Sequence, residues 1–312
     1  MFRIPIIFSG VIALFLLTTG VLSLGIWART ERSFPAPGNF IEVDGAQLHY
    51  VEQGRGRPIV MIHGSMLNTR DMEMSLFPSL VSDYRVIAFD RPGLGHSTRA
   101  QGQDLEDPRN QARLIHAALG EMGIAQPVIV AHSWGGAVAL AYAMEFPQDV
   151  KGLVLISSAA YPSNEQIGLY NLAQMPVVGS VARHTFLPPL MLAARPTLLD
   201  RFFGPNTPPP EYLDQVGLSL MTDSDRFLND AMDFNAVGPA LAQMRNGYRT
   251  MRTQMIIVTG DEDRAVSPED NSYRLHNEVV GSEMIVLEGI GHMPHHMATD
   301  EVVEAIVTMV ER

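Results

Sequence analysis

Cysteine is absent from the 312 residues of this sequence. Its absence excludes disulfide bonds and any metal site built on thiolates. The redox compartment stays open, because a chain without cysteine can fold in a reducing or an oxidising environment.

Basic residues are few compared with acidic ones. The chain has 22 Lys and Arg side chains against 34 Asp and Glu side chains, which gives a formal net charge of −12 at pH 7. A surface of this sign repels the phosphate backbone, and it argues against nucleic acid as a partner. The length is sufficient for one large α/β domain or two smaller ones.

Charge is also absent from a long apolar run at residues 4–27. About 20 apolar residues span the hydrocarbon layer of a membrane, and Trp27 at the far end suits the membrane interface. We therefore expect residues 1–28 to form a single-pass N-terminal transmembrane anchor, followed by a linker with Pro and Gly at residues 29–39. The alternative is a long signal peptide whose cleavage leaves a secreted or periplasmic protein, although no convincing Ala-x-Ala cleavage site follows.

After the linker, short apolar runs alternate with stretches of helical periodicity. The first two runs surround Asp44 and Gly45 and predict a β-hairpin. Alternating strands and helices predict a mainly parallel sheet that is covered by helices on both faces. The expected strands are residues 40–43, 47–51, 58–62, 84–89, 127–130, 152–156, 254–258 and 284–287, and the expected helices include 68–80, 107–122, 268–279 and 300–310.

The alternation stops between residues 157 and 248. This stretch is rich in Pro, Met and Leu and contains no apolar run typical of a buried strand. A connection of this length without a strand is uncommon unless it has a function. We expect a mostly helical insertion that acts as a cap or lid with an apolar inner face. Four of its methionines, which would fill the core of the cap or line an adaptable pocket, are Met175, Met191, Met221 and Met232.

A sharp turn of small residues joins a buried strand to a helix within residues 128–140. Ser133 occupies the corner of this turn, which would push its Oγ atom into the open space above the sheet. The strand and the helix pack closely there, so the flanking positions need small residues, and Ala131 and Gly135 meet this need. The pattern favours a nucleophilic serine, and the alternative is a turn without chemistry.

Two further polar groups follow other strand ends. Asp263 comes after the strand at 254–258, and His292 comes after the strand at 284–287. A serine hydroxyl is a weak nucleophile at neutral pH and needs an adjacent base, which His292 would supply. A carboxylate would hold the imidazole in the required tautomer. We therefore predict a catalytic triad of Ser133, Asp263 and His292.

Four motifs together resemble those of the α/β-hydrolase superfamily, in the branch that has a serine nucleophile and a cap inserted after the sixth strand. The order of nucleophile, acid and histidine is also the one found in this fold. The resemblance extends from Phe40 to the C-terminus, and its departure is Ala131, where the pattern prefers glycine. The motifs are A-H-S-W-G at 131–135, H-G at 63–64, D-R-P-G-L-G-H-S at 90–97 and G-I-G-H at 289–292.

The resemblance implies an α/β-hydrolase fold, in which a mostly parallel eight-stranded sheet is flanked by helices. Residues 40–156 and 249–312 would form the core, and residues 157–248 would form the helical cap. Together with the charge-free N-terminal run, it predicts a membrane-anchored serine hydrolase that cleaves an ester-like, apolar small-molecule substrate through an acyl-enzyme. No cofactor and no metal are expected.

The resemblance also implies roles for individual residues. The oxyanion hole would consist of the backbone N–H groups of Ser65 and Trp134. Asp263 is the implied acid because it lies three residues after Gly260, as in the G-x-x-D pattern of related enzymes. Asp261 lies one residue after the glycine and is expected to hold the turn.

Other reactions and roles stay open. The same triad serves C–C bond hydrolases, aminopeptidases and cofactor-free haloperoxidases. Dehalogenases and epoxide hydrolases of this fold use an aspartate nucleophile, and Ser133 argues against both. A non-catalytic binding protein on a hydrolase scaffold is a further alternative, although such proteins usually lose a member of the triad.

Four other histidines lie near these motifs, and we expect them to be structural. His132 precedes the serine, and its side chain should point away from the pocket. His63 should shape the oxyanion turn. His295 and His296 could suggest a metal, but they have no acidic partner at ligand spacing in the sequence.

Overall fold

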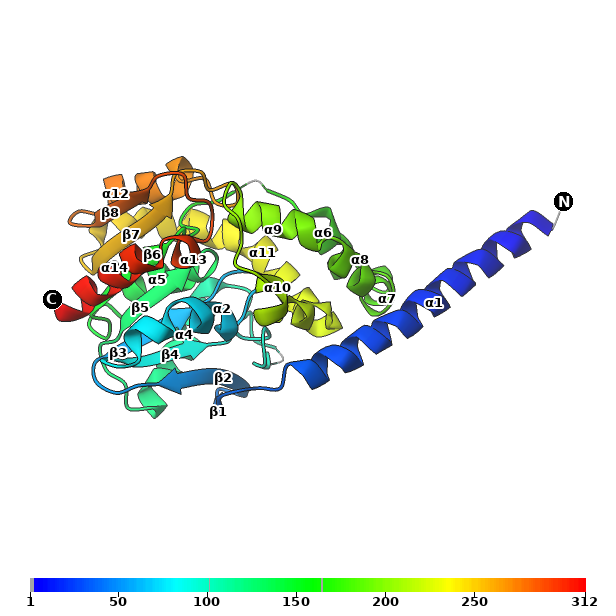
Figure 1. Cartoon of the computed structure of the whole chain (residues 1–312), viewed down its shortest axis with the longest axis horizontal. Helices are drawn as coiled ribbons and strands as arrows, with labels where there is room; N and C mark the ends of the chain where they lie inside the picture. Colours follow the sequence, from blue (N-terminus) through cyan, green and yellow to red (C-terminus); the bar gives the residue numbers. More distant parts are fainter. Residues whose placement is uncertain (1–2, 101, 164) are drawn as a thin grey trace.

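An eight-stranded sheet forms the body of the protein, and a long N-terminal helix extends away from it (Figure 1). The computed structural model describes residues 3–100, 102–163 and 165–312. The strand order in the sheet is β1-β2-β4-β3-β5-β6-β7-β8. The strands are β1 (Asn39–Val43), β2 (Ala46–Gln53), β3 (Pro58–Ile62), β4 (Arg85–Phe89), β5 (Val128–His132), β6 (Gly152–Ile156), β7 (Gln254–Gly260) and β8 (Glu283–Leu287).

Antiparallel pairing is confined to the first strands of the sheet. β1 and β2 form the predicted hairpin, and β2 also pairs antiparallel with β4. Asp44 and Gly45 both have positive φ angles, of 50° and 79°, as a two-residue hairpin turn requires. The pairings that join β4, β3, β5, β6, β7 and β8 are all parallel. The prediction of a mostly parallel eight-stranded sheet is confirmed.

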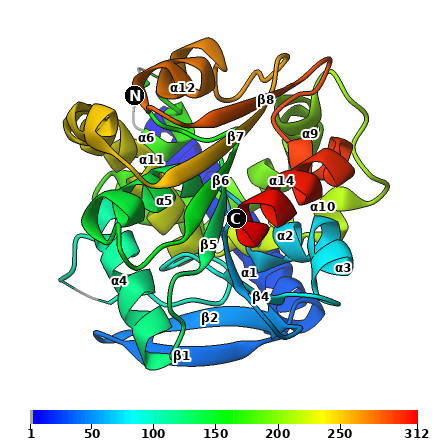
Figure 2. The same cartoon turned by 90° about the vertical axis from the view of Figure 1, so that its left-hand side faces the viewer.

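Helices cover both faces of this sheet (Figure 2). On one face, α4 (Pro108–Glu121) and α5 (Gly135–Glu145) bury apolar side chains against the strands. On the other face, α2 (Thr69–Ser75), α3 (Phe77–Leu80) and α14 (Thr299–Glu311) do the same. Because β5 and β6 are buried on both faces, their sequences are continuous apolar runs rather than alternating ones.

Two of the expected helices are interrupted. The stretch at 68–80 is divided into α2 and α3, because Pro78 has no N–H with which to continue the hydrogen bonding of α2. The stretch at 268–279 starts with a π-helical turn, η3 (Glu269–Tyr273), and continues as α12 (Arg274–Glu278).

The chain between β6 and β7 is a helical insertion, as predicted, and it lies beside one end of the sheet (Figure 1). Its apolar core includes Leu67 and Leu94 from the body, so the insertion packs onto the body. Met191 and Met221 belong to this core, whereas Met175 is 49% exposed. The elements are α6 (Gly168–Gln174), α7 (Val178–His184), α8 (Leu187–Ala193), α9 (Arg195–Phe203), α10 (Tyr212–Gln215), η1 (Leu218–Thr222), α11 (Ser224–Met244) and η2 (Arg245–Thr250).

The N-terminal helix α1 (Arg3–Ser33) is long and apolar enough to cross a membrane, by length and composition. Many of its large apolar side chains face outward, including Leu14 and Leu17. The helix extends beyond the expected span and includes the first part of the expected linker at 29–39. Only residues 34–38 separate α1 from β1.

Helix α1 also touches the insertion. The hydroxyl of Ser23 donates a hydrogen bond to the carbonyl of Thr185, between α7 and α8. Near the C-terminal end of α1, Glu31 forms an ion pair of 2.5 Å with Arg226 on α11. The insertion therefore lies against α1 as well as against the body.

Candidate active site

The turn between β5 and α5 holds Ser133 in an unusual backbone conformation. Its φ angle is +52°, a left-handed value that is uncommon for a residue with a side chain. The close approach of neighbouring chain explains the small residues around it, since a Cβ on Gly135 would lie 2.6 Å from the carbonyl oxygen of Ile62. A Cβ on Gly136 would lie 2.3 Å from the Cβ of Ser158. The corner predicted from the sequence is present.

Ser133, His292 and Asp263 form one chain of hydrogen bonds. The Nε2 atom of His292 lies 2.9 Å from the Oγ atom of Ser133, and its Nδ1 atom lies 2.7 Å from Oδ2 of Asp263. All three side chains are largely buried. They follow β5, β7 and β8, which are separate strands that reach the same edge of the sheet. The structure therefore brings together the three residues that the sequence selected.

Asp263 is held in its charged form. Burial opposes ionisation, but the His292 imidazole and the backbone N–H groups of Val266 and Ala265 lower the pKa of Asp263 below its ordinary value. An ionised carboxylate accepts a hydrogen bond from the Nδ1–H group of the imidazole. This tautomer leaves Nε2 as an acceptor for the hydroxyl proton of Ser133.

Asp261 has a different contact. Its Oδ1 atom accepts a hydrogen bond of 2.7 Å from the backbone N–H of Gly289. This contact joins the turn after β7 to the turn after β8. This contact agrees with the expectation that Asp261 holds the turn.

Two backbone N–H groups lie in the turns around Ser133. The turn at Gly64 approaches Ser133 closely, since a Cβ on Gly64 would lie 2.9 Å from the Cβ of Ser133. The next amide, of Met66, donates to Asp230. Within the described part of the chain, the amides of Ser65 and Trp134 donate no hydrogen bond to another residue. Both are therefore free to bind an oxygen atom beside Ser133.

His63 supports the turn that carries Ser65. Its Nδ1 atom donates to the carbonyl of Gly64 at 2.8 Å, and its Nε2 atom accepts from the backbone N–H of Arg91 at 2.9 Å. Burial is the main reason that its pKa falls to about 4, so the imidazole is neutral at physiological pH. These contacts agree with a shaping role for His63.

His132 supports the other side of the site. Its Nε2 atom donates to the carbonyl of His292 at 2.9 Å. Burial holds the pKa of His132 well below its ordinary value, so the ring is neutral. The residue also borders the cavity, although the sequence suggested that it would point away from the pocket.

His295 and His296 do have an acidic partner, which the sequence did not indicate. Both lie on α13 (Pro294–Met297), and their Nε2 atoms lie 2.9 Å and 2.8 Å from the carboxylate of Asp71 on α2. The hydroxyl of Tyr212 also donates to Asp71 at 2.7 Å. Asp71 and His295 are separated by 224 residues, so spacing in the sequence gave no sign of the contact.

The same region contains residue types that can bind a metal ion. Asp71, His132 and His295 each place one possible ligand atom within 4.8 Å of the others. The Asp71 carboxylate already accepts hydrogen bonds from both α13 histidines and from Tyr212. A metal would have to break these bonds, so the residues fit a hydrogen-bonded support for α13 better than a metal centre.

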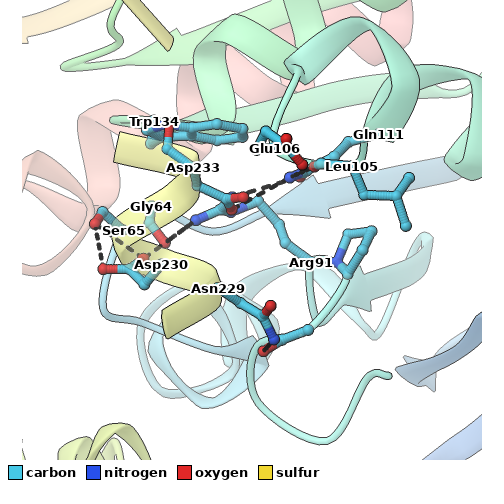
Figure 3. A network of polar contacts seen from close by, with 12 residues as sticks. Gly64, Ser65, Arg91, Leu105, Glu106, Gln111, Trp134, Asn229, Asp230 and Asp233 are labelled. Carbon is cyan, nitrogen blue, oxygen red and sulfur yellow. Dashed lines mark hydrogen bonds and ion pairs between the residues drawn. The ribbon is translucent and has the colours of Figure 1, made fainter. Parts of the chain in front are cut away.

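A buried network of charges lies next to the turn that carries Ser65 (Figure 3). Arg91 is fully buried and its Nη1 atom lies 2.6 Å from Asp233 on α11. Asp230, one turn earlier on α11, accepts hydrogen bonds from the Ser65 hydroxyl and from the Met66 amide. Arg91 belongs to the motif at 90–97, but no local pattern indicated its partner, because Asp233 is 142 residues away.

A cavity of about 750 Å³ opens beside the three triad residues. Its lining from the insertion is mixed, because the apolar side chains are joined by Asn171 and Asn235 and by the ion pair between Glu165 and Arg201. The inner face of the insertion is therefore more polar than the apolar face that was expected. None of the four methionines singled out in the insertion borders the cavity. The larger apolar side chains that the insertion contributes to the lining are Ile167, Leu198, Phe202, Phe234, Val237 and Leu241.

Comparison with known proteins gives the family. The sequence profile of the alpha/beta hydrolase family matches residues 59–305. The chain belongs to the alpha/beta hydrolase family. Lipase 1 of Psychrobacter immobilis is 26% identical over 267 residues, which cover 82% of this hydrolase and 78% of the lipase.

Two other curated relatives catalyse different reactions. A 2-hydroxy-6-oxononadienedioate/2-hydroxy-6-oxononatrienedioate hydrolase of Escherichia coli is 24% identical over 273 residues, which cover 82% of this chain and 90% of that enzyme. A cis-3-alkyl-4-alkyloxetan-2-one decarboxylase of Shewanella oneidensis is 27% identical over 129 residues, which cover 41% of this chain and 40% of that enzyme.

Solved structures share the fold. An esterase of Thermogutta terrifontis has a TM-score of 0.69 at 20% identity and covers 88% of this chain and 98% of its own. A meta-cleavage product hydrolase of Pseudomonas fluorescens has a TM-score of 0.67 at 21% identity, with coverages of 88% and 97%. A membrane phospholipase A has a TM-score of 0.67 at 19% identity, with coverages of 100% and 99%.

Proposed function

We propose that this protein is a membrane-anchored serine hydrolase that cleaves an ester-like substrate through an acyl-enzyme. The observation that carries the proposal is the continuous chain of hydrogen bonds from Asp263 through His292 to Ser133, at the wall of a large cavity. Nucleophile, base and orienting acid each have the contact that their role needs.

The reaction follows from this geometry. His292 Nε2 takes the hydroxyl proton of Ser133 as the Oγ atom bonds to the substrate carbonyl carbon. The carbonyl oxygen becomes an anion, which the N–H groups of Ser65 and Trp134 stabilise. His292 then returns the proton to the leaving alcohol as the ester C–O bond breaks. A water molecule attacks the acyl-enzyme in the same way and releases the acid.

The cavity supports a substrate with both apolar and polar parts. The apolar side chains of the insertion would contact the hydrocarbon part of the substrate. The Glu165 and Arg201 pair lies in the same wall and would contact a polar group. The insertion would act as the lid of this cavity.

Membrane anchoring is the second part of the proposal. Helix α1 has outward apolar side chains over the length that crosses a bilayer. The insertion contacts α1 at Thr185, just after α7. It carries further exposed apolar side chains at the start of α7, which include Val177 on the loop before this helix and Val178 on the helix itself. The likeness to a lipase and to a membrane phospholipase A agrees with a substrate of lipid character.

C–C bond hydrolysis is a second candidate, favoured by the likeness to the E. coli hydrolase and to the meta-cleavage product hydrolase. The same three residues would serve it. Turnover of a 2-hydroxy-6-oxo-dienoate, at rates that exceed those on every 4-nitrophenyl ester, would favour this reaction over ester hydrolysis.

Labelling with a fluorophosphonate probe tests the proposed nucleophile. The wild-type protein should be labelled, and Ser133→Ala should lose both the label and more than 99% of its turnover of 4-nitrophenyl esters. Ser82→Ala is the matched control, because Ser82 is exposed and lies outside the site. Retention of more than a few per cent of turnover by folded Ser133→Ala would exclude the covalent mechanism.

A further inference from the structure

Helix α11 of the insertion contacts the turn that carries Ser65 through the side chain of Asp230 (Figure 3). The carboxylate of Asp230 accepts a hydrogen bond of 2.8 Å from the Ser65 hydroxyl and one of 3.0 Å from the Met66 amide. The Tyr170 hydroxyl on α6 donates to the same carboxylate. Asp230 is fully buried, so these contacts are not exchanged with water.

Helix α11 also contacts Trp134, the other residue with a free amide beside Ser133. The indole Nε1–H of Trp134 donates to the backbone carbonyl of Asp233 at 3.2 Å. The guanidinium of Arg91 stacks on the indole, with 4.0 Å between Cζ and the ring centroid. One helix of the insertion therefore touches both residues of the proposed oxyanion hole.

The charges in this network are costly to bury. Desolvation lowers the pKa of Arg91 and raises that of Asp233, so the attraction between them does not fully offset the loss of water. Arg91 also lies 3.7 Å from Asp230. A network of this kind contributes little net stability, but removal of one partner leaves a buried charge unpaired. It therefore holds α11 and the turn in one relative position.

The turn itself needs such support. Met66 has a φ angle of +62°, a left-handed conformation that is unfavourable for a residue with a side chain. Its amide is the one that Asp230 binds. The bond to Asp230 thus compensates for the unfavourable backbone conformation that follows Ser65.

We propose that Asp230 is a positioning residue that holds the Ser65 amide toward the oxygen of the tetrahedral intermediate. It does not touch the substrate and acts through the Ser65–Met66 turn. The insertion would then take part in the reaction through α11, in addition to covering the cavity. This inference rests on the proposed serine-hydrolase function.

The test compares Asp230→Asn with wild type on 4-nitrophenyl butyrate. The amide replaces an accepting oxygen by a donor and removes the charge that faces Arg91, so the turn should shift. We expect kcat to fall about 10- to 100-fold, since loss of an oxyanion donor costs about 10²–10³ and this change only displaces one. KM should change less than about threefold, because the ground-state ester does not need the donor.

A transition-state analogue separates positioning from general damage. Phenylboronic acid forms a tetrahedral adduct with a nucleophilic serine, so its affinity for Asp230→Asn should fall by the same factor as kcat/KM. The matched control is Asp225→Asn, which removes an exposed carboxylate from the same helix. A comparable loss in the control, or a loss confined to KM in Asp230→Asn, would overturn the proposal.

Ser65→Ala provides a second route to the same answer. It keeps the Ser65 amide but removes the hydroxyl that binds Asp230, and we expect kcat to fall about 10-fold. The double variant of Ser65→Ala and Asp230→Asn should have a kcat no more than about twofold below that of Asp230→Asn alone. Both substitutions break the same hydrogen bond, the one between the Ser65 hydroxyl and Asp230. If Asp230→Asn does not fold, Ser65→Ala decides alone, and unchanged kcat and boronic acid affinity would then refute the role of Asp230.

Experiments on the wild-type protein distinguish failure of the proposed function from failure of the positioning role of Asp230. If the fluorophosphonate probe does not label wild-type Ser133, the proposed function is wrong, and with it the positioning role. If wild type is labelled and turns over the ester while folded Asp230→Asn matches it in kcat and boronic acid affinity, only the positioning role is wrong.

Discussion

Ser133 shows how a single residue can be placed for chemistry by an unfavourable backbone angle. The left-handed φ angle of +52° is maintained because the strand before it and the helix after it are both buried. The Ser133 amide also donates to the Ile156 carbonyl on the neighbouring strand. Ala131 replaces the glycine of the usual pattern and is accommodated in full burial, where the hydroxyl of Ser158 donates to its carbonyl.

The role of Asp263 as the acid of the proposed triad can be tested by a substitution that removes its charge but keeps its shape. Asp263→Asn should lower kcat by about 10³- to 10⁴-fold, because an amide no longer fixes the His292 tautomer that accepts the Ser133 proton. The matched variant is Asp261→Asn, which alters only the turn contact with Gly289 and should cost less than about tenfold. Rates in the reverse order would transfer the role to Asp261.

At the scale of elements, the insertion supplies most of one wall of the cavity. Helices α9 and α11 both contribute apolar side chains, and Leu198 on α9 is one of them. The mixed polar and apolar wall arises because α9 carries Arg201 at a position that meets Glu165 from the loop between β6 and α6. We therefore propose that the insertion, rather than the strands that carry the candidate triad, sets the substrate preference.

Leu198→Ala should change the preference for acyl length. The smaller side chain enlarges the cavity, and one methylene group is worth about 0.8 kcal/mol of apolar contact, so the ratio of kcat/KM for octanoate against acetate esters should change about 3- to 10-fold. Leu190→Ala is the matched control, because Leu190 on α8 is exposed and does not border the cavity. Equal losses on all 4-nitrophenyl esters would argue against a lid that selects substrates.

For the whole molecule, the proposed role of α1 is to anchor the hydrolase in a membrane. We expect the full chain to sediment with membranes and to need detergent, because transfer of the charge-free run of α1, residues 4–27, to water exposes its apolar side chains. A chain that starts at Phe34, just after α1, should stay in the supernatant and hydrolyse 4-nitrophenyl butyrate. Sedimentation of membranes followed by an activity assay of both fractions measures this.

A full-length control separates anchoring from loss of the N-terminus. Replacement of both Leu14 and Leu17 by Lys keeps the length of α1 but places two charges on its exposed side. This variant should also leave the membrane fraction. Mass spectrometry that finds a mature N-terminus beyond about residue 23 would instead identify a cleaved signal peptide.

The sequence by itself determined the sheet, the position of the insertion and the candidate triad. Each of these depends on local patterns: apolar runs specify buried strands, and the corner at Ser133 needs small neighbours such as Gly135. The carboxyl ends of parallel strands reach one edge of the sheet, so groups that follow two strands could be combined with Ser133. The choice of Asp263 over Asp261 came from the G-x-x-D pattern of related enzymes. Pro78 divided one expected helix because a single missing N–H outweighed the periodicity.

Only the tertiary structure decided which distant groups meet. Asp71 binds His295 across 224 residues, and Asp233 binds Arg91 across 142 residues. Neither pair lies at a helical or strand spacing, so no local pattern could show it. Such contacts arise because the insertion and α13 pack onto the body, and burial then requires each charge to find a partner. The mixed lining of the cavity has the same origin, since it depends on how α9 and α11 pack.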